Sequence, residues 1–172
     1  MAIGTRTLLP PGTSLLDGAV GGIISGIIMG LVSMILFVAL RIGSFWQPMY
    51  LIAAVVNQEW GMLQRFDIGP LVVGMVIHLA VSLILGAVWA WIISQTAVRQ
   101  AALVILSLVA FVIVWAVAQF IILPAIDPML IRVFPLWLWL VAHAVYGLVL
   151  GLYLTWRWST AAVAAPAPTG RM

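Results

Sequence analysis

The sequence contains no cysteine, no lysine and very few charged residues of either sign. Without cysteine the chain can form neither a disulfide framework nor a thiolate metal site, and a cysteine nucleophile is excluded. Charged residues make up 6% of the chain, whereas a soluble domain carries roughly 25%. The seven basic residues are arginines scattered singly, unlike the clustered charge of a nucleic-acid-binding surface. These absences predict no nucleic-acid partner and point to lipid as the solvent.

Hydrophobic residues make up 66% of the 172 residues, more apolar surface than a soluble domain of this size can bury. A transmembrane helix needs about 20 apolar residues to cross about 30 Å of hydrocarbon. Four segments meet this requirement, at about residues 16–40, 70–93, 101–123 and 136–155. We therefore predict an all-α, multi-pass integral membrane protein whose first partner is the lipid bilayer.

Prolines and tryptophans mark the ends of the predicted spans. Pro70 and Pro135 stand where a first helical turn tolerates proline, and Pro124 and Pro128 are expected to close the third helix. Most tryptophans fall at span ends, as in interfacial aromatic belts, whereas Trp115 lies inside the third span.

Arginines outside the spans give a small preference for one orientation. Four fall on the side of the termini (Arg6, Arg99, Arg157 and Arg171), and three on the other side (Arg41, Arg65 and Arg132). The positive-inside rule then predicts that both termini lie in the cytoplasm. The membrane that we expect is the cell (inner) membrane.

Two segments outside the spans carry their own predictions. The connection at residues 43–68 contains a short apolar stretch beginning near Pro48, which predicts a helix lying in the membrane interface. A re-entrant segment is the alternative for this connection. The C-terminal residues 159–172 contain Ala-Pro-Ala-Pro, which predicts an extended tail.

The second and fourth spans share one spaced pattern. Four residues recur at spacings of eight, eight and five: Pro70, His78, Gly86 and Trp91, then Pro135, His143, Gly151 and Trp156. The pattern predicts two tandem helical hairpins within a single membrane domain of residues 1–172. Repeat 1 covers about 16–93, with the insertion 43–68, and repeat 2 covers about 98–158. Two crossings per copy make the repeats parallel, related by an axis along the membrane normal.

Glycines four residues apart predict faces where helices pack closely. The first span carries Gly18, Gly22, Gly26 and Gly30 on one face. The same spacing puts Gly74 and Gly86 beside His78, and Gly147 and Gly151 beside His143. Both histidines should therefore face protein or a bound group rather than lipid.

Three hypotheses follow for the two intramembrane histidines. Each could donate a hydrogen bond to a carbonyl or hydroxyl group on a neighbouring helix. Alternatively, His78 and His143 could be the axial ligands of one haem b, or each could ligate a chlorin, with Trp115 lining the macrocycle. A transport path is the third hypothesis, although the acidic residues needed for a proton relay lie at the edges of the spans or outside them.

One stretch of the second half resembles a known family. Ala142-His143-Ala-Val-Tyr146-Gly147 continues to Gly151, and is preceded by Leu123-Pro124 and Asp127-Pro128-Met129. This pattern resembles the small four-helix bacterial membrane proteins of unknown function that are sometimes labelled sodium:proline symporters. The resemblance covers most of residues 16–157 and implies the four-helix architecture, but no activity.

No nucleophile–base pair, paired carboxylates or phosphate-binding loop is present in the sequence. We therefore expect a non-catalytic accessory subunit of a larger membrane complex, with other membrane subunits as partners. Respiratory or photosynthetic electron-transfer assemblies are the hosts we expect.

Overall fold

A computed structural model describes residues 11–96 and 100–164, with only the backbone at 11–13, 100–101 and 160–164. Four helices in this part are long and apolar enough to cross a membrane: Ser14–Ala39, Ile68–Ser94, Ala102–Ile126 and Leu136–Ser159. The described residues contain no strand. The prediction of an all-α chain with four membrane-length helices is confirmed.

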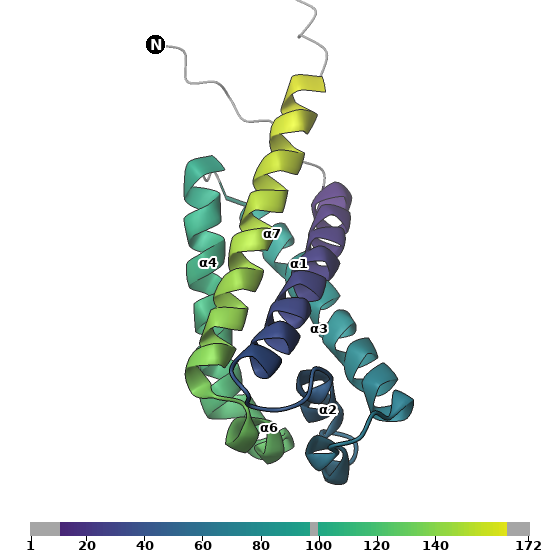
Figure 1. Cartoon of the computed structure of the whole chain (residues 1–172). Coiled ribbons are helices and arrows are strands. Elements are labelled where there is room, and N and C mark those ends of the chain that lie inside the picture. The colour runs from purple at the N-terminus through teal and green to yellow at the C-terminus, as the bar shows by residue number, and fades with distance from the viewer. Residues whose placement is uncertain (1–10, 97–99, 165–172) are drawn as a thin grey trace, which may run out of the picture.

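The four long helices form two hairpins that stand side by side. The first hairpin consists of α1 (Pro11–Ala39) and α3 (Ile68–Ser94), and the second of α4 (Gln100–Val117) and α7 (Leu136–Ala164). Helix α1 packs closely against both α3 and α7, and α4 packs closely against α7. Helix α3 passes behind α1 towards the upper end of α4 (Figure 1), where the indole N–H of Trp89 donates to the hydroxyl of Ser107 in α4 at 2.8 Å.

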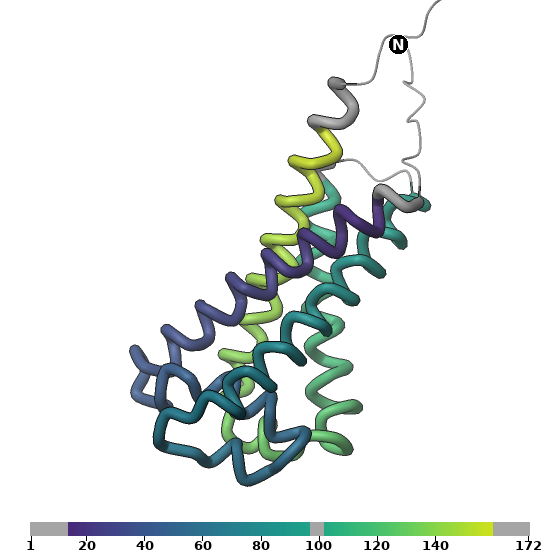
Figure 2. Tube along the Cα trace, turned by 90° about the vertical axis from the view of Figure 1, so that its right-hand side faces the viewer, coloured from purple at the N-terminus to yellow at the C-terminus, as the bar shows by residue number. Residues whose placement is uncertain are grey.

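One end of the bundle is closed by short elements, which appear at the bottom of Figures 1 and 2. Helix α2 (Gln47–Ala53) begins beside Pro48, as predicted, and is almost entirely buried against α3 and α1. The 3-10 helix η1 (Gln58–Met62) follows it. The hydroxyl of Tyr50 accepts a hydrogen bond from the backbone N–H of Asp67 at 2.7 Å, which ties α2 to the start of α3.

The third span runs past Pro124 to Ile126 and ends just before Pro128. Of the two prolines that were expected to close this helix, Pro128 follows its end and Pro124 does not. Helix α4 passes into a π-helical turn, η2 (Ala118–Ile122), and then into α5 (Leu123–Ile126), where Pro124 occupies the first turn. Proline has no N–H to offer the preceding turn, and a π turn is one way for a helix to pass such a break. Asp127 ends α5 and caps α6 (Pro128–Val133), with its carboxylate accepting from the N–H of Leu130.

The first part of the segment predicted to be an extended tail is helical. Helix α7 continues to Ala164, because Ser-Thr-Ala-Ala-Val-Ala contains no helix breaker and Pro166 is the first proline after it. Residues 165–172 lie outside the described part of the chain.

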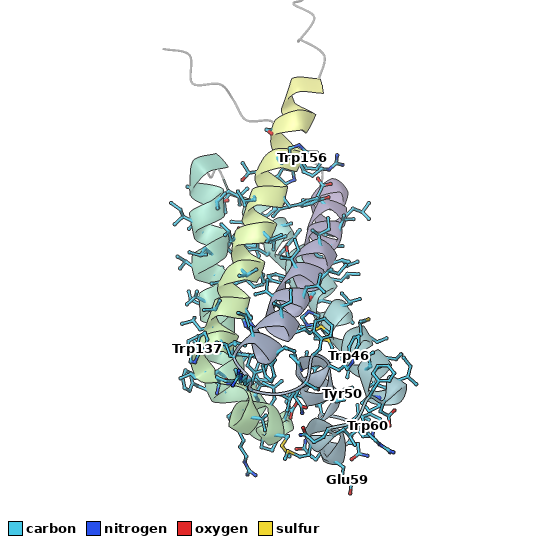
Figure 3. All side chains as sticks on the ribbon, in the orientation of Figure 1. Trp46, Tyr50, Glu59, Trp60, Trp137 and Trp156 are labelled. Atoms are coloured by element: carbon cyan, nitrogen blue, oxygen red, sulfur yellow. The ribbon has the colours of Figure 1, made fainter. Side chains whose placement is uncertain are left out.

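Tryptophans stand near both ends of the last helix. Trp137 lies near the lower end of α7 and Trp156 near its upper end, and both side chains are largely exposed (Figure 3). At the upper end, the carboxylate of Asp17 accepts hydrogen bonds from Nε of Arg157 at 3.0 Å and from the indole N–H of Trp158 at 3.2 Å. These bonds join the first hairpin to the second near the membrane edge.

Candidate functional site: a cavity between the hairpins

The glycine face of α1 lies along α3. A Cβ at Gly18 or Gly22 would overlap the α3 backbone at Gly86 or Ser82, and one at Gly26 would overlap the Ser82 side chain. At Gly30 a Cβ would stand 3.4 Å from Nε2 of His78. The two backbones are therefore in direct contact along the first hairpin, as small residues allow in a membrane.

The other predicted glycines face three different neighbours. Gly86 meets the backbone of Gly18 and Gly22, completing the contact within the first hairpin. Gly74 faces the backbone of Met49 in α2 rather than another span. In the second hairpin, Gly147 and Gly151 lie against α4 near Ser107.

His78 points from α3 towards α1. Its Nε2 lies 2.9 Å from the carbonyl oxygen of Gly26. A carbonyl oxygen only accepts hydrogen bonds, so Nε2 carries the hydrogen and Nδ1 keeps its lone pair. His78 thus makes the bond to a neighbouring helix that the first hypothesis required.

His143 behaves differently, although it occupies the matching position of the sequence pattern. Its Nδ1 lies 3.0 Å from the carbonyl oxygen of Trp139, one turn earlier in the same helix. The expectation of a bond to a neighbouring helix is therefore wrong for His143. The same reasoning places the hydrogen on Nδ1, so Nε2 carries a lone pair and has no partner among the described residues.

Both imidazoles line one cavity of about 510 Å³ between the two hairpins. Its walls come from α3, α4 and α7, and its lower end reaches α2, α5 and α6. The wall is almost wholly apolar, with residues such as Val81, Leu85, Phe111 and Val114. A space of this size with a few polar groups is typical of a binding site for a small molecule.

Two further polar residues border the cavity near the histidines. The hydroxyl of Tyr146 donates a hydrogen bond to the backbone oxygen of Ser82 at 2.5 Å, and this bond crosses from α7 to α3. The Ser82 hydroxyl itself lies against Gly26 of α1. Tyr146 therefore links the hairpins on one side of the cavity and leaves only an oxygen lone pair available.

Asp127 lies at the lower end of the cavity and is 2% exposed. Burial raises the pKa of its carboxyl group above the usual value, while hydrogen bonds from the Leu130 N–H and the Gln58 side chain act in the opposite direction. Its removal from water disfavours the charged form of a carboxyl group, which shifts the group towards neutrality.

Aromatic residues near the site are not the ones that the sequence suggested. Trp115 packs in the apolar cluster with Phe37 and Leu138 and does not line the cavity. Trp139 and Phe111 line it instead. The indole N–H of Trp139 is buried in the wall without a hydrogen-bond partner.

The cavity itself was missed by the sequence analysis, as were Tyr146 and Asp127 as members of its wall. No cluster of three potential metal ligands occurs among the residues that the structure describes. Comparison with protein-family models, curated proteins and solved structures finds no match to this chain. The resemblance to the small four-helix family therefore stays a prediction.

Proposed function

We propose that this protein is a non-catalytic integral-membrane subunit that holds a lipophilic molecule in the cavity between its hairpins. The cavity carries this proposal, because it combines an apolar wall with a few polar groups at membrane depth. Helices α3 and α4 meet at Trp89, whose indole N–H donates to the Ser107 hydroxyl at 2.8 Å and whose ring lies edge-on to Phe111, but few of their backbone positions come close together. A bound molecule would fill the space between the two helices that these side chains leave open.

The tandem-repeat hypothesis predicts how α3 and α4 should pack, so the cavity between them bears on it. Two parallel hairpins related by a two-fold axis would match the α1–α7 contact with an equal α3–α4 contact. Helix α1 does pack on α7, whereas the counterpart contact between α3 and α4 is made by side chains such as Trp89 and Ser107 and leaves the cavity beside it. We propose that the hairpins are tandem copies whose second central contact is completed by the ligand. We further propose that α2 and η1 cap the hairpins at one membrane surface. Both termini then lie in the cytoplasm.

Retention of a ligand tests the proposal. The protein is purified from its native membrane and its organic extract is compared by mass spectrometry with that of Val114→Trp. The larger side chain should occupy the cavity and abolish a compound that the wild type retains in stoichiometric amount. Equal extracts, containing bulk phospholipid alone, would count against a ligand-holding function.

The subunit part of the proposal has its own test. We propose an electron-transfer assembly as the host, because a chain of four spans with little mass outside them suits a supporting role. Mild extraction and native electrophoresis should place the chain in a particle larger than its own oligomers. A stable particle of this chain alone, with no partner after cross-linking in membranes, would reject an accessory role.

Haem binding is a second candidate, and one contact favours it. The Nδ1–H of a metal-bound histidine commonly donates to a backbone carbonyl, which orients Nε2 towards the metal, and His143 has this arrangement. Nε2 of His78 is already bonded to Gly26, so ligation by both histidines is not favoured. A reduced-minus-oxidised spectrum of native membranes tests this candidate. It predicts an α band that disappears in His143→Ala.

A further inference from the structure

Beside the two histidines, the polar atoms that the cavity offers to a ligand are hydrogen-bond acceptors, whereas Asp127 lies apart from them at the lower end. Nε2 of His143 and Nδ1 of His78 carry lone pairs, because the other nitrogen of each ring donates to a carbonyl. The hydrogen of the Tyr146 hydroxyl is committed to Ser82. The donors nearby are withdrawn, since the Trp139 N–H is buried in the wall and the Ser82 hydroxyl lies against α1.

A wall of acceptors selects its ligand by chemistry. A ketone, ester or ether has only lone pairs to offer, and it would leave the imidazole nitrogens without a hydrogen bond. An ammonium group would donate, but it would bring an uncompensated charge into the hydrocarbon region. A neutral hydroxyl group donates without this cost, and an apolar body attached to it would fill the remaining wall.

We infer that the cavity selects a lipophilic molecule ending in a hydroxyl group, whose O–H is donated to Nε2 of His143. This inference rests on the proposed function and names the class of ligand. His143 is 8% exposed and lines the cavity, and its ring is held by Trp139 through both a hydrogen bond and a ring contact at 4.9 Å. The acceptor is therefore fixed in place before a ligand arrives.

The π-helical turn that takes the helix past Pro124 also borders this site. Ala118 and Ile122, at the two ends of η2, both line the cavity. Such turns occur frequently at functional sites. In this chain the interruption lies on the wall facing the two histidines rather than on the lipid side alone.

The test compares matched pairs of probes on the full chain in detergent micelles under nitrogen. The first pair is a decyl-substituted hydroquinone and its dimethyl ether, and the second is dodecanol and its methyl ether. Calorimetric titration should give tighter binding of each hydroxyl probe than of its ether, by about tenfold, which one neutral hydrogen bond supplies. The oxidised quinone should bind like the ethers, because it has no O–H.

Two variants test whether His143 is the source of the preference for hydroxyl over ether probes. In His143→Phe the advantage of the hydroxyl probes should disappear, whereas the lipid-facing control Leu152→Phe should keep it. Hydroxyl and ether probes that bind equally to the wild type would overturn the inference, even if His143→Phe fails to fold. If Val114→Trp then weakens the binding of both the hydroxyl and the ether probes, the ligand-holding function stands. Absence of saturable binding by every probe would overturn the function and the inference together.

The two probe pairs also separate the sources of such a hydroxyl group. Tighter binding of the hydroquinone than of dodecanol would indicate an aromatic redox carrier as the physiological ligand. The reverse order would indicate an aliphatic lipid alcohol. Either order supports the selection of a hydroxyl group, provided that each alcohol exceeds its own ether.

Discussion

The two hairpins place a histidine at the same step of the sequence pattern but in different surroundings. His78 reaches a backbone carbonyl of α1 because Gly26 and Gly30 have no side chains to keep the imidazole away. Helix α4, which packs on the helix of His143, contains no glycine and presents Phe111 to it. The imidazole of His143 therefore bonds within its own helix and keeps a free nitrogen. Equal spacing in the sequence does not give an equal environment.

The same contrast governs how closely the helices approach. In the first hairpin, Gly86 meets the backbone of Gly18 and Gly22. In the second, Gly151 meets Cα of Val104 and the side chain of Ser107. Both hairpins bring two backbones together, but a Cβ would overlap its neighbour more deeply at Gly86 than at Gly151, where Cα of Val104 would stand 2.8 Å away.

The largest expected effect comes from adding a methyl group at each of these glycines. Gly86→Ala should lower the free energy of unfolding by about 3 kcal/mol, because two helix backbones must separate. Gly151→Ala should cost about 2 kcal/mol, because its Cβ would stand 2.8 Å from Cα of Val104, a milder overlap than that of Gly86 with the Gly18 carbonyl. Denaturant unfolding in mixed micelles measures both. An equal cost would show that the hairpins are packed equally closely, and a reversed order would show that the second is the tighter.

The two histidine substitutions should differ by less than the glycine substitutions in their effect on the free energy of unfolding. His78→Ala removes a hydrogen bond between helices and should cost about 1 kcal/mol, within the range found for such bonds in membrane proteins. His143→Ala removes a bond inside one helix, whose carbonyl also belongs to the helical backbone ladder, and should cost less. The same unfolding measurement compares them. A greater cost at His143 would mean that its ring supports the bundle rather than the cavity.

The smallest effect concerns Asp127 and depends on pH. Because the pKa of Asp127 is raised in the folded protein, the native state holds the proton more tightly than the unfolded chain does. Stability should therefore be greatest below the unfolded pKa and should fall as pH rises through the native pKa. Asp127→Asn keeps the cap of α6 and should remove this fall.

Thermal midpoints of the wild type and Asp127→Asn, taken from acidic to neutral pH, test this expectation. The two curves should meet at low pH, with the variant the more stable of the two near neutrality. A wild type that gains stability as pH rises would mean that the carboxylate is favoured in the folded state. The cavity would then carry a negative charge at its lower end.

The spans were predictable because their signal is local. Runs of apolar residues long enough to cross the hydrocarbon define all four helices, and the glycine spacing on α1 indicates a face that the structure places against α3. The short helix near Pro48 was also located correctly, from one apolar stretch between polar residues. Each of these features depends on neighbours within a few turns.

The site was less predictable because it depends on distant residues. No spacing reveals the cavity between α3 and α4, because the distance between their backbones follows from how α1 packs against both α3 and α7. The sequence predicted that Trp115 would line a macrocycle, yet it packs against the apolar cluster that contains Phe37 and Leu138. Proline is a strong signal for a helix end, and Pro124 failed as one because a π turn absorbs the break.

The order of the helices has a consequence for how the protein is made. The first hairpin leaves the ribosome before the second, and its glycine contact can form before α4 and α7 are synthesised. Helix α4 emerges next, but the helix against which it packs most closely is α7, which follows it in the chain. During synthesis α4 is therefore exposed to lipid on the side that α7 later covers. The second hairpin, and with it the cavity, can be assembled only when α7 has inserted.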